Sequence, residues 1–235
     1  MTTLYLIRHG QTDNNLVGCY NGCKSNQPLN ALGMRQAAAL TAPFAKIRPD
    51  VIYASTLCRA VMTAEGVRGT REMPIHTVYE LREMDMGDLD GVTFAETRAN
   101  WPEIWHNWHE EPEKLQMPNG ESFTDARLRA AAAISRIVRE NRGKCIAVVA
   151  HGSLLSLAVS HFFGLPLAGR YEVPYLPNAS YHSLAVEDDG HFSAIAFRCC
   201  DHLVGELLSS PLKEGNAAAL SGRFFYPDFA KEPTP

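Results

Sequence analysis

The stretch "LYLIRHGQTDNN" (residues 4–15) decides how the rest of this chain is interpreted. Residues 4–7 are apolar and indicate a buried strand, and Arg8, His9 and Gly10 follow it directly. A fixed cation and an imidazole placed together at a strand end are what a binding site for an anion requires. A solvated loop could carry the same residues without a function, so the other segments must choose between the two interpretations.

The composition is that of an ordinary globular protein. Its 235 residues, 46% hydrophobic and 20% charged, suffice for one sizeable core, and we expect one domain over residues 1–235. The formal net charge of −4 argues against a non-specific nucleic-acid binder. No stretch approaches the roughly 18 apolar residues of a membrane span, and Arg8 comes too early for a signal peptide. With six scattered cysteines, expected as free thiols, the predicted location is the cytoplasm.

Apolar and amphipathic segments alternate along the chain. Strands are predicted over residues 3–8, 50–55, 75–81 and 144–150, and helices over residues 31–47, 57–67, 122–143 and 152–164. Residues 181–199 predict two further strands joined by a turn at Asp189-Gly190. This alternation predicts an α/β fold: a three-layer sandwich with a mostly parallel central sheet flanked by helices. A tryptophan-rich helical insert (about 92–121) and a C-terminal extension (about 205–235) interrupt it.

Charged side chains follow four of the predicted strands. Arg8 and His9 follow the first, Ser55 and Arg59 the second, Glu83 the third, and His151 with Gly152 the strand over residues 144–150. Ligands of open α/β sheets bind beyond the carboxyl ends of the strands. If the sheet is parallel there, these groups converge, and the anion-site interpretation of the opening stretch is favoured.

Seven segments resemble motifs of the histidine phosphatase (phosphoglycerate mutase-like) superfamily, in the family's order over residues 4–180. The opening stretch is similar to RHGxTxxN, and the other six are "PLNALGMRQA" (28–37), "STLCRAVMTA" (55–64), "ELREMDMGDLDG" (80–91), "PNGES" (118–122), "VVAHGS" (148–153) and "LPNAS" (176–180). The "PNGES" segment resembles the phosphatase branch. Each motif alone is a weak signal, whereas seven in register are a strong one.

The resemblance implies a role for each matching residue. His9 would be the nucleophile that forms a phosphohistidine, and Glu83 the general acid and then the general base. Asp85, two residues away, is the rival proton donor. Phosphate binding would fall to Arg8, Asn15, Arg59, His151, Gly152, Thr12 and Ser55.

Elementary chemistry agrees with these roles. A phosphomonoester dianion needs positive charge around its oxygens during transfer, and arginine forks match two oxygens while staying charged. Neighbouring cations favour the neutral, nucleophilic form of an imidazole. We therefore expect no metal and no cofactor. His106 and His109 lack further ligands at zinc spacing. Trp101, Trp105 and Trp108 are predicted to share one packing face of the insert, which could also form a lid.

The sequence thus predicts a metal-independent phosphomonoester hydrolase that acts through a phosphohistidine on a small phosphorylated metabolite. The alternatives are a phosphoglycerate mutase-type phosphotransferase, a non-catalytic phosphate-binding regulator and a zinc hydrolase. The expected partner is a small-molecule phosphomonoester, without nucleic acid or membrane, and the sequence sets no oligomeric state. Sugar phosphates, α-ribazole phosphate, bisphosphorylated sugars and phosphoproteins all stay open as substrates, with the chain length favouring small molecules.

Overall fold

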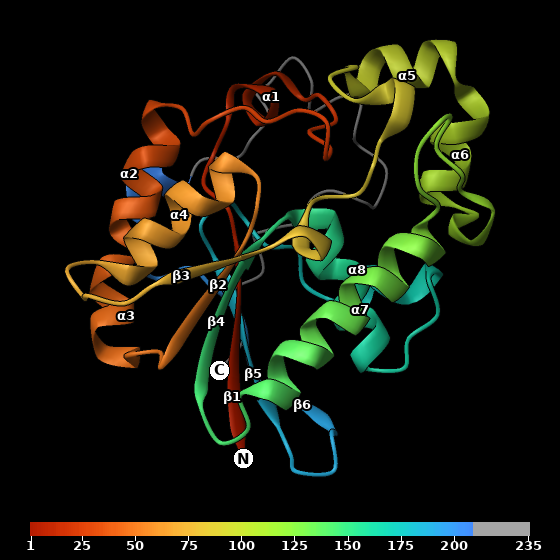
Figure 1. Cartoon of the computed structure of the whole chain (residues 1–235). Coiled ribbons are helices and arrows are strands. Elements are labelled where there is room, and N and C mark those ends of the chain that lie inside the picture. Colours follow the sequence, from red (N-terminus) through yellow and green to blue (C-terminus); the bar gives the residue numbers. More distant parts are fainter. Residues whose placement is uncertain (209–235) are drawn as a thin grey trace, which may run out of the picture.

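A computed structural model describes residues 1–208, and within this range six strands form one sheet. Their order across the sheet is β3-β2-β4-β1-β5-β6. The bounds are β1 (Thr2–Arg8), β2 (Val51–Ser55), β3 (Ile75–Val78), β4 (Cys145–Ala150), β5 (Tyr181–Val186) and β6 (Phe192–Cys199). Strands β1 to β4 run parallel, and β5 pairs antiparallel with β1 and β6. The predicted α/β fold with a mostly parallel sheet is confirmed (Figure 1).

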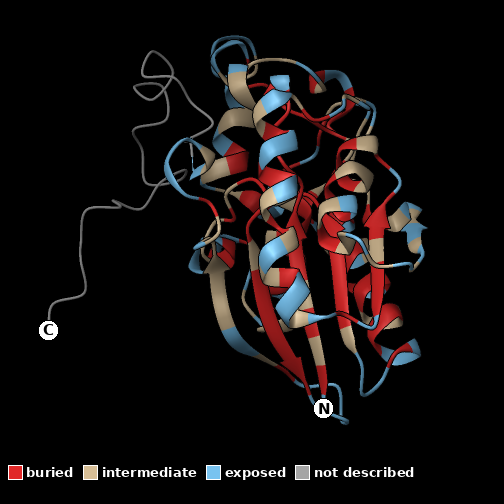
Figure 2. Cartoon of the chain, turned by 90° about the vertical axis from the view of Figure 1, so that its left-hand side faces the viewer, coloured by how far each residue is buried: buried red, intermediate tan, exposed pale blue. Residues whose placement is uncertain are grey.

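Helices cover both faces of the sheet because the central strands are apolar on both sides. In β4, Ile146 and Val148 pack against α7 (Phe123–Glu140) and α8 (Gly152–Phe162). Ala147 and Val149 face the other layer, formed by α2 (Ala31–Ala39), α3 (Thr41–Ile47) and α4 (Cys58–Arg68). Side chains alternate between faces along a strand, so an unbroken apolar run is what a doubly covered strand needs. The strands are accordingly buried between helices whose outer faces are exposed (Figure 2).

Two predicted elements have different bounds. The helix expected over residues 31–47 is two helices that meet at Leu40, because Pro43 lacks the N–H that would bond to the carbonyl of Ala39. The strand expected over residues 75–81 ends at Val78, the last residue paired with β2, and a 3-10 helix (Tyr79–Leu81) follows. Further 3-10 helices span Gly87–Leu89, Pro112–Lys114, Ala168–Glu172 and Gly205–Leu208.

The tryptophan-rich insert forms α5 (Phe94–Asn100) and α6 (Pro102–His109). Together with α1 (Asp13–Val17), these helices lie beyond the carboxyl ends of the parallel strands (Figure 1). The predicted common tryptophan face is wrong in part. Trp101 lies between the two helices because Pro102 begins α6, Trp105 packs on His109, and Trp108 is buried in the apolar cluster beneath the insert.

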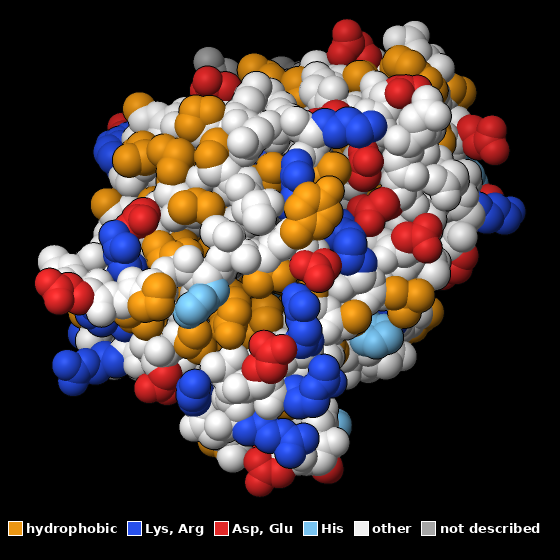
Figure 3. All heavy atoms as spheres, viewed as in Figure 1, with side chains coloured by type: hydrophobic (Ala, Val, Ile, Leu, Met, Phe, Trp, Pro, Cys, Tyr) orange, Lys and Arg blue, Asp and Glu red, His pale blue; other side chains and the backbone are white. Residues whose placement is uncertain are grey.

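Several observations concern the described residues as a whole. None of their helices is both long and apolar enough to cross a membrane. Within residues 1–208, no three His, Cys, Asp or Glu side chains are grouped to hold a metal ion. On the face seen in Figure 3, basic and acidic side chains are intermixed. Most of the predicted C-terminal extension, from residue 209 on, lies outside the described residues.

Candidate active site

The two central parallel strands bring two histidines together. Strand β1 pairs with β4 so that Arg8 lies opposite Ala150, and the next residues, His9 and His151, leave the sheet side by side. Their ring centres are 5.1 Å apart, and both side chains are buried. One oxyanion can therefore contact both rings, as the strand-end argument predicted.

The imidazole of His9 is fixed in one tautomer by its neighbour. Its Nδ1 lies 2.6 Å from the carbonyl oxygen of Gly10, and because a carbonyl only accepts, Nδ1 carries the proton and Nε2 carries the lone pair. Gly10 is needed because a Cβ there would lie 2.7 Å from the carbonyl oxygen of Gly33. The "RHG" order thus supplies an arginine, an oriented imidazole and room behind it.

Electrostatics keep His9 neutral. Burial lowers its pKa well below the ordinary histidine value, and the charges of Arg59 and then Arg8 lower it further. The pKa of His151 is lowered in the same way, by burial first and then by Arg59. A neutral imidazole with a directed lone pair is able to attack phosphorus.

Several buried polar atoms around this point have no hydrogen-bond partner among the described residues. They are Nε of Arg8, Nε of Arg59, both ring nitrogens of His151 and one acceptor, Oδ1 of Asn21. Buried polar groups are rarely left without partners, so such a set requires an explanation. Each arginine Nε and one nitrogen of the neutral His151 ring carry a proton, so these three side chains can each donate a hydrogen bond to an oxyanion.

Arg59 is held from behind by backbone carbonyls. Its guanidinium is fully buried and donates to Ser25 at 2.6 Å and to Asn21 and Gly22 at 3.0 Å each. Burial lowers its pKa to about 10, against the raising effects of Glu83 and then Asp90, so Arg59 stays charged at neutral pH. These three hydrogen bonds therefore fix the orientation of the Arg59 guanidinium.

Arg8 is held by the "LPNAS" region and its preceding residue. Its Nη1 donates to the carbonyl oxygen of Leu176 at 2.7 Å and to the hydroxyl of Tyr175, over whose ring the guanidinium lies. Asn178 donates to the backbone carbonyl of His9 at 3.0 Å and so ties this region to the nucleophile. Tyr175 and the role of Asn178 escaped the sequence interpretation.

Glu83, rather than Asp85, faces the site. The Glu83 carboxylate accepts hydrogen bonds from Met84 at 2.9 Å, from Leu154 at 3.0 Å and from Ser153 at 3.2 Å, the last two at the start of α8. Burial raises its pKa, although these bonds and Arg59 act in the opposite direction. Asp85 accepts from the backbone N–H of Gly87 at 2.8 Å and pairs with Lys24 at 3.3 Å. Geometry therefore favours Glu83 as the proton donor.

These groups border a cavity of about 90 Å³. A buried water needs only about 10–15 Å³ on this measure, so there is room for a phosphoryl group. Arg8, His9, Asn15, Glu83 and Gly152 are among the residues that line it. Arg59 and His151 are fully buried and are not among the lining residues.

Two predicted phosphate ligands, Thr12 and Ser55, make local hydrogen bonds, and their role in phosphate binding stays a prediction. Thr12 caps α1 by accepting from the N–H of Asn15, and Asn21 also donates to it. Ser55 accepts from the N–H of Leu57 in the turn before α4. Like Arg59 and His151, neither residue is among those that line the cavity.

The remaining residues of the cavity wall are Cys19, Tyr20, Asn21, Met86, Phe94, Trp108, Ser153 and Tyr175. Phe94 and Trp108 come from the insert, which therefore borders the cavity, as a lid would. No motif marked the loop residues 19–21, whose position depends on the packing of the insert.

The comparisons with known proteins agree with this geometry. The model of the histidine phosphatase superfamily (branch 1) matches residues 4–196. The chain is 29% identical to a metal-independent phosphoserine phosphatase of Arabidopsis thaliana, covering 84% of this chain and 86% of that protein. It is 35% identical to a 2,3-bisphosphoglycerate-dependent phosphoglycerate mutase of Rhizobium etli, covering 65% and 75%. A solved phosphoserine phosphatase variant of Entamoeba histolytica, in complex with phosphoserine, has a TM-score of 0.78 at 25% identity, covering 87% of this chain and all of that one.

Proposed function

The chain belongs to the histidine phosphatase superfamily, and from this premise we propose that it hydrolyses small phosphomonoesters with His9 as the nucleophile. The observation that carries the proposal is the neutral, oriented imidazole of His9 among buried, unpartnered polar atoms of Arg8, Arg59 and His151. A site of this kind suits a phosphoryl dianion, whose oxygens supply acceptors for the two arginine Nε–H groups and for the one N–H of the His151 ring.

In the first half-reaction, Nε2 of His9 attacks phosphorus and forms a P–N bond. The P–O bond to the leaving alcohol breaks, and Glu83 gives its proton to the departing oxygen. Arg8, Arg59 and His151 stabilise the charge that spreads over the phosphoryl oxygens. The proton stays on Nδ1 of His9, where it is donated to the carbonyl oxygen of Gly10, and this hydrogen bond stabilises the positive phosphoimidazole.

In the second half-reaction, the Glu83 carboxylate takes a proton from water as the oxygen attacks phosphorus. The P–N bond breaks, inorganic phosphate leaves, and His9 and protonated Glu83 are restored. Within residues 1–208, Oε2 of Glu83 accepts one hydrogen bond, from Ser153, so a further position on this oxygen can hold the proton. Burial and the nearby phosphate dianion both favour the protonated carboxyl.

No step requires a metal, because the two arginines supply the positive charge. We propose one histidine phosphatase domain over residues 1–235, with the insert and the C-terminal extension as additions to it; the single sheet supports this. A cytoplasmic location stays a prediction of the sequence.

A second candidate function is phosphoryl transfer to a second hydroxyl, favoured by the similarity to the mutase. Incubation with 3-phosphoglycerate separates the two functions. A phosphatase releases inorganic phosphate and leaves no 2-phosphoglycerate, whereas a mutase forms that isomer. Formation of the isomer faster than phosphate release would replace the proposed function by the second one.

Acid-sensitive trapping tests the nucleophile. Rapid quenching with a ³²P-labelled aryl phosphate should leave label on the protein that is stable to base and lost in acid, located on His9. The His9→Ala variant should take up no label, and the His76→Ala variant, altered at an exposed strand residue, should label normally. Label on another residue, or turnover by His9→Ala near the normal rate, would refute the role of His9.

A further inference from the structure

Much of the cavity wall is aromatic. Tyr20, Phe94, Trp108 and Tyr175 line the cavity together with Met86. Among the described lining residues, the charged side chains are Arg8 and Glu83, and the proposed function places both at the phosphoryl group. The group attached to the phosphate therefore meets rings and neutral side chains.

This aromatic wall is an extension of the core. Tyr20 packs edge-on against Phe94, with ring centres 4.9 Å apart, and against Trp108 at 5.2 Å. Trp108 in turn packs on buried Phe123 at 4.8 Å. Tyr20 and Trp108 are buried, and Phe94 and Tyr175 are half-buried. Because these rings are packed against one another, the wall does not rearrange easily to admit water around a charged group.

We propose that the preferred substrate carries an uncharged aromatic or otherwise apolar alcohol, and not an amino-acid or carboxylate-bearing group such as that of phosphoserine. The inference rests on the proposed function. A carboxylate against this wall would lose hydration and find no described cation other than those engaged by the phosphate. An aromatic group would bury apolar surface and gain edge-to-face ring contacts.

A pair of non-hydrolysable phosphonates tests this substrate class without leaving-group chemistry. Benzylphosphonate carries a ring, and 2-amino-3-phosphonopropionate carries an ammonium and a carboxylate. Titration calorimetry on the full chain should give a benzylphosphonate affinity at least ~10-fold higher. Equal affinities, or tighter binding of the amino-acid phosphonate, would overturn the substrate class. Failure to hydrolyse any phosphomonoester would instead overturn the proposed function, and the binding comparison does not depend on it.

Phe94 and Trp105 provide a matched pair of variants within the insert. Phe94→Ala should reduce the ratio of the two affinities by roughly five- to tenfold, because one ring of the wall is lost. Trp105→Ala should leave the ratio unchanged, since Trp105 packs on His109 and does not line the cavity. The ratio is insensitive to a partly unfolded sample. An unchanged ratio in Phe94→Ala would overturn the proposal.

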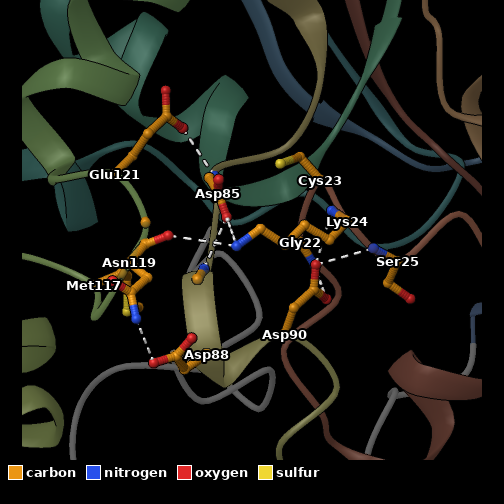
Figure 4. Close-up of polar contacts among 12 residues, drawn as sticks. Gly22, Cys23, Lys24, Ser25, Asp85, Asp88, Asp90, Met117, Asn119 and Glu121 are labelled. Carbon is orange, nitrogen blue, oxygen red and sulfur yellow. Dashed lines mark hydrogen bonds and ion pairs between the residues drawn. The ribbon is translucent and has the colours of Figure 1, made fainter.

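A second, independent observation concerns Asp90 and the segment that holds Arg59. In Figure 4, the Asp90 carboxylate points toward the backbone of Gly22 and Ser25. Its Oδ1 accepts from the N–H of Gly22 at 3.0 Å, and its Oδ2 accepts from Lys24 at 2.9 Å and from Ser25 at 3.0 Å. The Asp90 carboxylate thus accepts three backbone hydrogen bonds from the segment formed by residues 22–25.

Carbonyl groups of the same segment accept hydrogen bonds from Arg59. Gly22 and Ser25 donate their N–H groups to Asp90, and their carbonyl oxygens accept from the Arg59 guanidinium. Glycine fits at residue 22, since a Cβ there would lie 2.7 Å from Cγ of Met86, 2.9 Å from Oδ2 of Asp90 and 3.0 Å from the carbonyl oxygen of Met84. Asp90 and Arg59 are therefore linked through a tightly packed piece of backbone.

The geometry points to Asp90 as a positioning residue that orients Arg59 toward the phosphoryl group through residues 22–25. In Asp90→Asn, an amide N–H₂ would face backbone N–H donors, and at least one of the present bonds would be lost. The segment would shift, and the carbonyls that hold Arg59 would shift with it. Misplacement of a catalytic cation by about 1 Å can cost roughly 100-fold in rate.

Asp90→Asn should lower kcat/KM roughly 10- to 100-fold and weaken binding of inorganic phosphate, measured by calorimetry. Asp88→Asn is the matched control, because Asp88 is exposed and accepts from the Asn119 side chain at 2.8 Å instead of from residues 22–25. A purely structural role would lower the melting temperature and leave phosphate affinity unchanged. That outcome would overturn the proposal.

A double-mutant cycle with Arg59→Ala isolates the linkage. If Asp90 acts through Arg59, Asp90→Asn should change kcat/KM of the Arg59→Ala variant less than about twofold. Fully additive losses would overturn the positioning role. If Asp90→Asn fails to fold, Gly22→Ala perturbs the contact between Asp90 and the same segment and should give the same non-additive loss.

Discussion

Replacing Glu83 with glutamine removes the transferable proton and keeps the shape of the side chain. The glutamine carbonyl can accept the two hydrogen bonds that Oε1 now receives, from Met84 at 2.9 Å and Leu154 at 3.0 Å. The new amide group replaces Oε2, which accepts the longer bond from Ser153 at 3.2 Å. The fold should therefore change little, and the loss should fall on proton transfer.

The size of this loss depends on the leaving group. General acid catalysis contributes roughly 10²- to 10⁴-fold, which is about 2.7–5.4 kcal/mol of the barrier. Benzyl phosphate leaves as a basic alkoxide and should show this full loss. 4-Nitrophenyl phosphate leaves as a stable phenolate and should lose less than about tenfold. The assay is kcat/KM for both esters at one pH, in wild type and in Glu83→Gln.

Asp85→Asn is the matched control, since Asp85 lies two residues from Glu83 and pairs with Lys24 outside the cavity lining. This variant should leave the ratio of the two kcat/KM values unchanged. Equal losses on both esters in Glu83→Gln would refute Glu83 as the proton donor. A loss confined to benzyl phosphate in Asp85→Asn would transfer the role to Asp85.

Four other perturbations test the site. Burial lowers the pKa values of His9 and His151. Below about pH 6.5 these histidines therefore become protonated in the unfolded chain but not in the folded chain. Each histidine then lowers the free energy of unfolding by up to ~1.4 kcal/mol per pH unit. His151→Asn should flatten the decrease in urea-unfolding free energy between pH 6.5 and 5.5, and an unchanged slope contradicts this. Burial raises the pKa of Glu83, so Glu83→Gln should melt at a higher temperature than wild type at pH 8, with the gain shrinking as the pH falls toward the ordinary carboxyl value; a lower melting temperature at pH 8 counts against it. Gly10→Ala should lower the free energy of unfolding by about 1–3 kcal/mol, because its Cβ would lie 2.7 Å from the carbonyl oxygen of Gly33. A urea-denaturation midpoint equal to that of the wild type would contradict this close packing. Added chelator should leave phosphatase activity unchanged, whereas a loss restored by Zn²⁺ would support a zinc hydrolase.

Much of the architecture could be predicted from local patterns. The apolar run of β4 needs cover on both faces, and the alternation of strands and helices makes its neighbours parallel. Parallel strands end at one edge, so His9 and His151 were expected to meet, and they do. Helix ends were predicted less well: the break at Leu40 depends on one missing N–H at Pro43.

Local sequence patterns specify which chemical groups this protein has and predict that strand ends gather them, because strand periodicity and parallel pairing are encoded locally. The folded structure places Glu83 and Asp85 in different environments, since the α8 N–H groups and the burial that distinguish them come from distant parts of the chain. It also decided that Trp108 borders the cavity and Trp105 does not, because packing against Tyr20 and Phe123 sets the rotation of α6. Backbone carbonyl groups hold the Arg59 guanidinium. Every residue carries such a group, so no pattern of side chains in the sequence could predict these hydrogen bonds.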